Sequence, residues 1–316
     1  MSKKPLTIEQ ILKDEGKRLD LKLVSGHEGL KNVIETSELN RPGLAFAGFY
    51  SVFSNDRIQI LGITELSFLK SLPESERKKR LEKTFKFEIP CFIVTSGQDI
   101  FPELVDLSNK HNIPILSTSI ITSRFWGLLS YYLERWFAPE ITIHGGLLDV
   151  YGLGVLIIGK SGIGKSECAL ELVERGHRLV ADDAVLIKKI AKNILVGMSE
   201  GPLKYHMEVR GLGIIDVVAL FGIGSVREEK KVSMQITLEK WNEEKNYERL
   251  GIEEETVTIL DVTIPSYVIP VEPGRNLSIL IEVATLLQRS KSSGKNPALE
   301  LNKELIRRMQ NNKSEK

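Results

Sequence analysis

The sequence contains little cysteine and no long apolar stretch. Only two of its 316 residues are cysteines, Cys91 and Cys168, and they lie far apart without the spacing of metal ligands. This excludes a disulfide framework and suits a reducing compartment. The best candidate for a membrane span, residues 141–159, carries His144, Asp149 and five glycines, whereas a span needs about 20 predominantly apolar residues. The first 16 residues also lack the apolar core of a signal peptide, so we expect a soluble, cytoplasmic protein without a membrane partner.

An excess of charge of one sign is also lacking. The 43 basic and 42 acidic side chains leave a formal net charge of +1, which argues against a protein that coats nucleic acid. The hydrophobic fraction of 42% and the charged fraction of 27% are those of an ordinary globular protein. Because 316 residues exceed one typical domain, we expect two domains.

The first part of the chain alternates helical and strand-like patterns. A capping-box pattern at residues 7–10 opens a helix. Residues 89–97 form a continuous apolar run that predicts a buried strand, and a helical pattern at 102–112 leads to another strand at 113–118. This alternation predicts an α/β sandwich with at least partly parallel pairing. We expect this N-terminal α/β domain to span residues 1–135.

An aromatic, amphipathic helix at residues 123–137 closes this part, and Ala138-Pro139 ends it. We therefore place a C-terminal domain at residues 136–316. Four aromatic side chains of the helix could stack on a ligand: Trp126, Tyr131, Tyr132 and Trp136. Because they recur at helical spacing beside leucines, we expect them instead to pack against the neighbouring domain.

The C-terminal part contains a motif that binds phosphate. Its eight residues fit the pattern G-x-x-x-x-G-K-[ST] and stand between a strand-like run and a helical one: Gly159, Lys160, Ser161, Gly162, Ile163, Gly164, Lys165 and Ser166. The glycines let backbone amides approach phosphate oxygens, and the start of the helix adds a partial positive charge. Lys165 can reach the β- and γ-phosphates, and the Ser166 hydroxyl can bind Mg²⁺. The sequence therefore predicts a nucleoside triphosphate site.

Two adjacent carboxylates follow the phosphate loop. Asp182 and Asp183 end a strand-like run that begins at residue 178. A carboxylate in this position commonly contacts Mg²⁺ or its water. Successive strand residues point to opposite faces, so one aspartate is expected to face the site while the other is structural; two solvated turn residues are the alternative. Further on we expect a hairpin ahead of the loop, a helix at 276–290 and a last helix at 298–310.

Several other charged residues carry no signal of their own. His144 alone indicates a packed histidine rather than a catalytic one, and Glu208, Arg210 and Arg249 are ordinary charges by composition and periodicity. Their significance comes only from a resemblance.

The segments GKSGIGKSE, RGHRLVADDAV, EVRGLGIID and PGRN, in this order and spacing, resemble the family of bifunctional HPr kinase/phosphorylases. The segments NRPGLAFAGFY, RIQILGITELSFL, IPCFIVT and TIHGGLLDVYG are similar to the N-terminal and junction regions of that family, and the resemblance extends to Val283. It implies an enzyme that phosphorylates a serine of the phosphocarrier protein HPr, with ATP or also pyrophosphate as donor, and that dephosphorylates the phosphoserine with inorganic phosphate to give pyrophosphate. It also implies a homohexamer and a C-terminal P-loop kinase domain similar to the nucleotide-binding core of phosphoenolpyruvate carboxykinase.

The resemblance also implies roles for matching residues. His144 and Lys165 would be active-site residues, Ser166 and Glu208 would bind Mg²⁺, and Arg249 would stabilise charge on the transferred group. Asp183 would accept the proton of the target serine and return it in the reverse reaction. Residues 207–216 match a stretch tied to both activities, and residues 270–275 one tied to dephosphorylation.

Two positions depart from the family pattern. In PVEPGRN, Glu272 replaces a residue that is usually basic, and we expect weaker phosphate binding and impaired dephosphorylation. Lys160 stands where an acidic residue is common, and adds positive charge to the loop.

Two other functions stay open on the sequence alone. One is phosphoryl transfer to a small metabolite, for which the additional metal ligands and arginines of phosphoenolpyruvate carboxykinase are not identifiable. The other is a non-catalytic nucleotide-sensing scaffold, against which the retention of His144, Asp183 and Arg249 argues.

Overall fold

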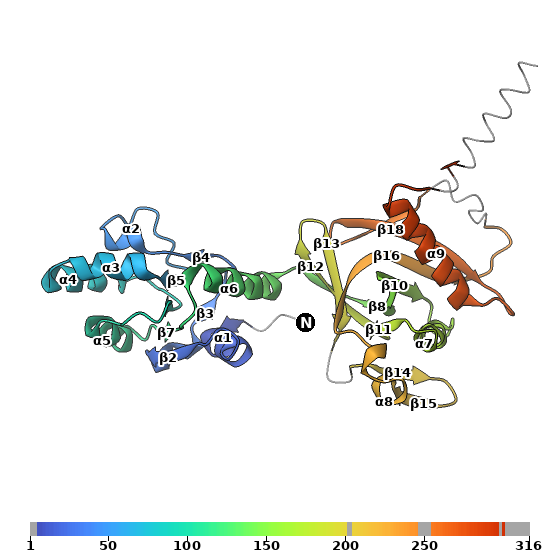
Figure 1. Ribbon diagram of the computed structural model, residues 1–316, viewed down its shortest axis with the longest axis horizontal. Helices are drawn as coiled ribbons and strands as arrows, with labels where there is room; N and C mark the ends of the chain where they lie inside the picture. The colour runs from blue at the N-terminus through green and yellow to red at the C-terminus, as the bar shows by residue number, and fades with distance from the viewer. Residues whose placement is uncertain (1–4, 201–203, 246–253, 297–298, 301–316) are drawn as a thin grey trace, which may run out of the picture. The chain divides into compact units, whose positions relative to one another are not determined.

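The protein consists of two compact units, each described here by its own elements (Figure 1). The computed structural model describes residues 5–200, 204–245, 254–296 and 299–300. Contacts divide the chain between Phe137 (end of unit 1) and Ala138 (start of unit 2), slightly later than the division at residues 135 and 136 drawn from the sequence. Among the described helices, none combines the length and hydropathy that a membrane crossing requires.

Unit 1 is built on a five-stranded sheet in the order β2-β7-β6-β5-β4. Its strands are β2 (Lys22–Ser25), β4 (Leu39–Asn40), β5 (Ile58–Leu61), β6 (Phe92–Val94) and β7 (Ile115–Ser117). β4, β5, β6 and β7 run parallel, and β2 pairs antiparallel with β7 at one edge. A separate antiparallel pair comprises β1 (Leu6–Thr7) and β3 (Val33–Ile34).

Helices cover both faces of this sheet (Figure 1). They are α1 (Ile8–Glu15), η1 (His27–Lys31), α2 (Gly43–Phe46), α3 (Ile63–Ser71), α4 (Glu74–Thr84), α5 (Pro102–His111) and α6 (Thr122–Phe137). Successive residues of β6 point to opposite faces: Ile93 belongs to the apolar cluster with α1 and α6, whereas Phe92 and Val94 belong to the cluster with α3, α4 and α5. The predicted α/β sandwich is confirmed. The predicted start of α1 is confirmed as well, since Thr7 Oγ1 accepts a hydrogen bond from the N–H of Gln10.

The aromatic residues of α6 belong mainly to the core of unit 1. Trp126, Tyr132 and Trp136 pack against the same apolar cluster as Phe125 and Leu129, while Tyr131 is 48% exposed. These contacts are made within their own unit, where the sequence analysis expected packing against the neighbouring domain. The periodicity identified a buried face, but it contains no information about which surface covers that face.

Unit 2 contains a nine-stranded sheet in the order β11-β9-β10-β16-β13-β12-β8, to which β18 adds beside β16 and β17 beside β18. The strands are β8 (Glu140–His144), β9 (Gly146–Val150), β10 (Leu153–Gly159), β11 (Arg178–Ala181), β12 (Ala184–Ala191), β13 (Ile194–Ser199), β16 (Glu229–Lys240), β17 (Thr256–Ile259) and β18 (Val262–Val271). β10, β16 and β18 run parallel, and β9 and β10 form the predicted hairpin. A separate pair comprises β14 (His206–Val209) and β15 (Gly213–Asp216).

The helical segments of unit 2 are α7 (Lys165–Glu174), α8 (Val217–Phe221), η2 (Ile223–Ser225) and α9 (Leu277–Ser292). α7 and α9 cover one face of the sheet, where Leu172 and Ile281 join the apolar side chains of β10 and β16. α9 confirms the helix expected at 276–290. The helix expected at 298–310 lies, apart from residues 299–300, outside the described residues. The strand end expected at the aspartate pair is confirmed: β11 ends at Ala181, Asp182 and Asp183 form a bend, and β12 begins at Ala184.

Candidate active site

The phosphate loop connects the end of β10 to the start of α7, as the motif predicts. Gly162 and Gly164 have φ angles of 76° and 100°, a left-handed conformation that glycine adopts without strain. Gly159 lies close to β16, since a Cβ there would come within 2.6 Å of the backbone oxygen of Leu238. The glycines are therefore required both by the turn and by the close approach of two parallel strands.

The start of α7 is suited to binding an anion. Its N-cap, Gly164, provides no side-chain hydrogen bond to the first turn, so backbone N–H groups remain for phosphate oxygens. Lys165 Nζ donates to the backbone oxygens of Gly159 at 3.0 Å and Lys160 at 3.3 Å. The ammonium group is thus held over the loop, where a bound phosphate would meet it.

Arg210 also lies over the phosphate loop, although composition and periodicity predicted only an ordinary charge there. A Cβ at Gly162 would come within 2.9 Å of Arg210 Nη2, which places the guanidinium group against the middle of the loop. The residue follows β14, whose buried Met207 packs with α7 in the apolar core. Only its position in the segment EVRGLGIID could have indicated a functional role for Arg210. Its proximity to the loop depends on the tertiary packing of β14.

Asp182 is directed toward the phosphate loop. Its side chain hydrogen-bonds to Ser166, and Lys165 is close enough to act on its charge. Burial raises the pKa of Asp182, and the Ser166 hydrogen bond opposes that effect. A half-buried carboxylate beside a hydroxyl group forms a set of oxygen donors of the kind that Mg²⁺ prefers. The sequence pattern predicted that one of the two aspartates faces the site, without indicating that it is Asp182.

Asp183 and His144 are brought together at the rim of the same site. Their closest atoms, Asp183 Oδ1 and His144 Nδ1, are 4.0 Å apart, and the two side chains are 90% and 88% exposed. The pairing of β8 with β12 places His144 opposite Ala184, and the N–H of Gly145 donates to the backbone oxygen of Asp183 at 3.0 Å. Asp183 has a φ of 66°, so the chain turns at this residue and the two aspartates do not follow the alternation of a regular strand.

The glycines after His144 allow this arrangement. A Cβ at Gly145 would lie 2.4 Å from the backbone oxygen of Ile157 in β10, and one at Gly146 would lie 3.6 Å from Asp182 Oδ1. Any larger residue at position 145 would push β8 away from the phosphate-loop strand. The HGG sequence therefore positions the histidine through close backbone packing.

The remaining predicted site residues are placed less completely. Glu208 is an exposed residue of β14 beside the buried Met207. Arg249 lies outside the described residues. Within the described ranges, no three His, Cys, Asp or Glu side chains gather as a ready-made metal site.

The unusual Glu272 lies just after β18. Its Oε2 is 3.5 Å from Arg275 Nε, and the guanidinium group of Arg275 lies over the ring of Trp241 at 5.8 Å. The negative charge of Glu272 is therefore partly neutralised by the arginine of its own PGRN segment.

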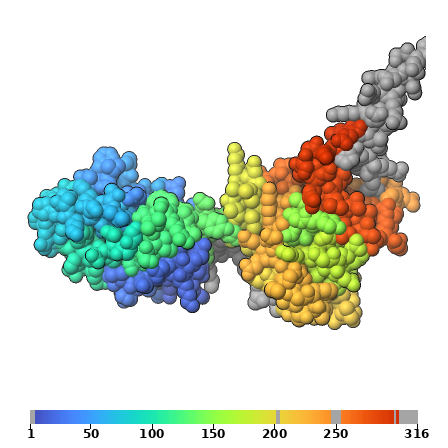
Figure 2. All heavy atoms as spheres, viewed as in Figure 1, coloured from blue at the N-terminus to red at the C-terminus, as the bar shows by residue number. Residues whose placement is uncertain are grey.

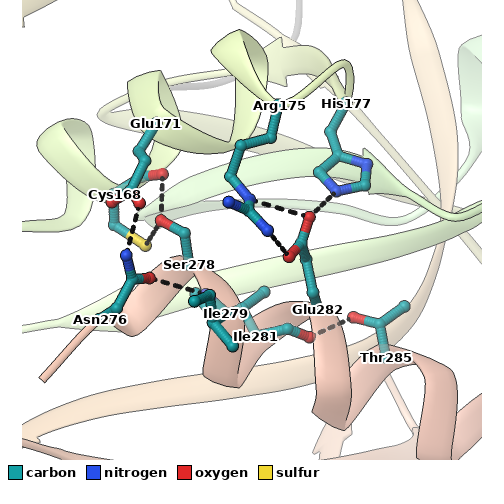
Figure 3. A network of polar contacts seen from close by, with 10 residues as sticks. All are labelled: Cys168, Glu171, Arg175, His177, Asn276, Ser278, Ile279, Ile281, Glu282 and Thr285. Carbon is teal, nitrogen blue, oxygen red and sulfur yellow. Dashed lines mark hydrogen bonds and ion pairs between the residues drawn. The ribbon is translucent and has the colours of Figure 1, made fainter.

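A polar network fixes the far side of α7 to α9 (Figure 3). Glu282 accepts hydrogen bonds from Arg175 Nη2 at 2.5 Å and pairs with His177 Nε2 at 2.9 Å. Asn276 caps α9 through the N–H of Ile279 and donates to Glu171 at 2.7 Å. We call this network the α7–α9 clasp; it holds the helix that begins with Lys165 and Ser166.

Buried groups extend the clasp between its two ends. Ser278 is fully buried, and its Oγ lies 3.5 Å from Cys168 Sγ. Burial raises the pKa of the Cys168 thiol to about 11, so the cysteine stays neutral and acts as a packing residue.

Comparisons with known proteins agree with the resemblance. Models of the HPr Serine kinase N terminus and of the HPr Serine kinase C-terminal domain match residues 6–133 and 135–305. The HPr kinase/phosphorylase of Caldanaerobacter subterraneus subsp. tengcongensis is 47% identical, covering 97% of this chain and 99% of its own. That of Bacillus cytotoxicus is also 47% identical, covering 93% and 95%. The solved HPr(Ser) kinase/phosphatase from Coxiella burnetii is 38% identical and covers 49% of this chain and 93% of its own, with a TM-score of 0.46.

Proposed function

Because the chain belongs to the HPr serine kinase family, we propose that it phosphorylates a serine of HPr with ATP and also dephosphorylates the phosphoserine. The observation that carries this proposal is the presence, in one place, of an anion-binding loop and two carboxylates, one half-buried beside Ser166 and one exposed beside His144. An exposed carboxylate at the rim of a phosphate site is accessible to the hydroxyl of a protein substrate.

In the kinase direction, Asp183 would act as the general base. The serine oxygen forms a bond to the γ-phosphorus while its proton passes to the Asp183 carboxylate, and the bond to the β-phosphate oxygen breaks to release ADP. A positioned base contributes roughly 10²- to 10⁴-fold to such a step. Lys165 and Arg249 would stabilise the charge of the transferred group, and His144 would orient Asp183.

In the reverse direction the same groups would serve phosphorolysis. An oxygen of inorganic phosphate bonds to the phosphorus of phosphoserine, and the serine oxygen leaves with the proton held by Asp183. The products are serine and pyrophosphate. One site can carry both directions because forward and reverse steps of this kind use the same alignment of phosphate, carboxylate and serine oxygen.

ATP with Mg²⁺ would be the phosphoryl donor. Ser166 and Glu208 would bind the metal, and Asp182, through its hydrogen bond to Ser166, would hold the serine hydroxyl in place. Mg²⁺ would supply neutralisation of charge on the phosphates. The side chains of Ser166 and Asp182 offer only oxygen atoms as ligands, and Mg²⁺ prefers oxygen ligands.

The surface beside the loop supports a protein substrate. The segment from β14 to η2 exposes four apolar side chains at 63–76%: Leu212, Ile214, Leu220 and Ile223. This segment forms part of the surface seen in Figure 2. Exposed apolar groups next to a catalytic site are typical of a surface that receives another protein. A small metabolite would not need them.

Three further features belong to this proposal. The C-terminal domain would be the kinase/phosphorylase domain, with a core similar to that of phosphoenolpyruvate carboxykinase, and the chain would assemble as a homohexamer. Free, buried Cys91 and Cys168 fit action in the reducing cytoplasm. Light scattering of the purified protein measures the oligomer directly.

The test is incubation of the purified protein with labelled ATP, Mg²⁺ and HPr, followed by phosphate and detection of pyrophosphate. We expect label on an HPr serine and its phosphate-dependent loss. Asp183→Asn should abolish both reactions while nucleotide still binds. The matched control is Asp261→Asn, because Asp261 is also exposed, at 96%, and has a φ of 60°, yet lies in the β17–β18 turn. Equal activity of the Asp183 and Asp261 variants would contradict the assignment of the base.

A further inference from the structure

A second candidate site lies in unit 1, at the carboxyl ends of its parallel strands. The chain leaves β4 at Arg41, β5 at Gly62, β6 at Thr95 and β7 at Thr118. In open α/β sheets, ligands bind in the crevice outside the carboxyl ends of parallel strands. The proposed catalytic function uses no residue of this edge.

A pocket of about 510 Å³ opens at this edge, which is within the usual size range of sites for small molecules. It is lined by residues that follow three of the parallel strands and by the first turn of α6: Arg41, Ile63, Thr64, Ser96, Ile121, Thr122, Ser123 and Trp126. Arg41 is the one ionised residue of this lining. The polar members are therefore a cation and hydroxyl groups, which favours an anionic ligand.

The guanidinium group of Arg41 is fixed in place before any ligand binds. Glu65 Oε1 accepts from Nε at 3.0 Å and Oε2 accepts from Nη2 at 2.8 Å. Glu65 is 5% exposed and also accepts the N–H of Gly62 at 3.0 Å. Because Glu65 takes one edge of the guanidinium, Nη1 remains for a ligand, with no other partner in the described part of the chain. A cation held this way loses little conformational freedom on binding.

Two helix starts border the same pocket. Ile63 and Thr64 form the first turn of α3, whose N-cap Gly62 supplies no side chain, and Thr122 and Ser123 form the first turn of α6. Thr122 Oγ1 bonds to Thr95 Oγ1 at 2.7 Å. Gly62 lies close to them, since a Cβ there would be 2.7 Å from Thr122 Oγ1. This packing brings both helix starts, each with its partial positive charge, to the edge that also holds Arg41.

The lining of the pocket also contains apolar side chains. Ile63 and Ile121 are 56% and 60% exposed, and Trp126 is half-buried, with one part packed against the core of unit 1. Together they form a surface on which a flat organic group can lie.

From these observations we propose that this pocket binds a small phosphomonoester whose organic part is a flat ring. The hydrogen-bond donors of the lining are Arg41 Nη1 and the hydroxyl groups of the threonines and serines. They are more than the two oxygens of a carboxylate require, and they suit the three oxygens of a phosphate. The ring lies against Trp126 and the two isoleucines. Such a ligand would make unit 1 a metabolite-binding module, which is independent of the chemistry proposed for unit 2.

The experiment is calorimetric titration of the full chain with phenyl phosphate, in a Lys165→Met background that weakens phosphate binding at the loop of unit 2. Three comparison ligands each lack one feature of phenyl phosphate. Phenol lacks the anionic group, inorganic phosphate lacks the ring, and benzoate carries a carboxylate in place of the phosphate. We expect saturable binding of phenyl phosphate, and binding of each of the other three at least about tenfold weaker. No binding of phenyl phosphate, or equal binding of any comparison ligand, would overturn the proposal.

The site is identified with the double variant Arg41→Gln/Glu65→Gln, which removes both charges and leaves no unpaired buried carboxylate. The matched control is Arg77→Gln/Glu103→Gln, because in this pair of unit 1, outside the pocket, Nε and Nη2 of an arginine also donate to a carboxylate, here both to Glu103 Oε1. The first variant should bind about tenfold or more weakly, and the control should bind as the parent does. If the double variant proves unstable, Ser123→Leu fills the pocket from an exposed helix position and should have the same effect. Full affinity in Ser123→Leu and in the Arg41 variant would overturn the assignment.

Discussion

Two histidine–carboxylate pairs lie near α7, and they differ in burial. His144 and Asp183 are 4.0 Å apart and almost fully exposed, with side chains at 88% and 90%. His177 and Glu282 are 2.9 Å apart and 7% and 8% exposed. The exposed pair is screened by water and adds little to stability. The buried pair, together with Arg175, forms the α7–α9 clasp, whose polar groups are costly to leave unpaired.

This difference in burial separates a pair that is proposed to act in catalysis from a pair that stabilises the fold. A base must be reachable by its substrate, so Asp183 benefits from exposure, and its loss should affect rate alone. Glu282 holds two cationic or polar partners where a carboxylate without partners would be unfavourable, so its loss should affect stability first. Substitutions in the exposed histidine–carboxylate pair should therefore change the rate, whereas substitutions in the buried pair should change the stability.

The largest effect is expected when the two histidines are exchanged for alanine. His144→Ala should lower phosphoryl transfer about a hundredfold with an unchanged melting temperature, because its side chain is 88% exposed. His177→Ala should lower stability by roughly 1–3 kcal/mol with activity largely kept at low temperature. Initial rates and thermal unfolding of both variants measure this, and a destabilised His144→Ala would break the comparison.

Asp182 lies between these extremes, because its side chain is half-buried and belongs to the site. Burial raises its pKa, so the ionised form costs stability at neutral pH, a cost that disappears as the pH falls through that raised pKa. Asp182→Asn should therefore stabilise the nucleotide-free protein at neutral pH while weakening Mg²⁺–ATP binding about tenfold to a hundredfold. Calorimetric ATP titration and unfolding curves give both quantities. Unchanged ATP affinity would remove Asp182 from the site.

The clasp predicts a dependence of stability on pH. The hydrogen bond from Arg175 holds the pKa of Glu282 below its ordinary value of 4.5. A lowered folded-state pKa contributes stability above the ordinary value, and that contribution is lost as the pH falls through the folded-state value. Glu282→Gln should be less stable than the wild type by roughly 1–3 kcal/mol at neutral pH, and the difference should shrink in acid.

Urea unfolding at neutral pH and well below pH 4.5 measures this difference. Glu171→Gln, at the more exposed end of the clasp, is the control and should lose less stability. A difference for Glu282→Gln that does not change with pH would show that packing rather than charge makes the contribution.

The smallest effect concerns Glu272. Its charge is partly neutralised by Arg275, so Glu272→Arg would both remove a negative charge and release a positive one. We expect phosphate-dependent dephosphorylation to increase severalfold, on the order of 1 kcal/mol, with kinase activity nearly unchanged. Rates of both reactions at varied phosphate concentration check this. Unchanged phosphorolysis contradicts a role for Glu272 in phosphate binding.

The two sites differ in how far they could be predicted. The phosphate loop was predictable because its glycines, Lys165 and Ser166 are neighbours in the chain, and their geometry follows from a local turn into a helix. The alternation of strands and helices in unit 1 was also predictable. The pocket there was not, because Arg41, Gly62 and Thr122 meet only when strands far apart in the sequence lie side by side.

By itself, the sequence determined the phosphate loop, the strand and helix pattern and the family. Tertiary structure decided which of its charged residues are exposed and which are buried. Nothing local distinguishes His144 from His177, whereas their carboxylate partners lie 39 and 105 positions away. The physical reason is that pKa, accessibility and hydrogen bonding depend on the environment that folding brings to a side chain, and that environment comes from distant parts of the chain.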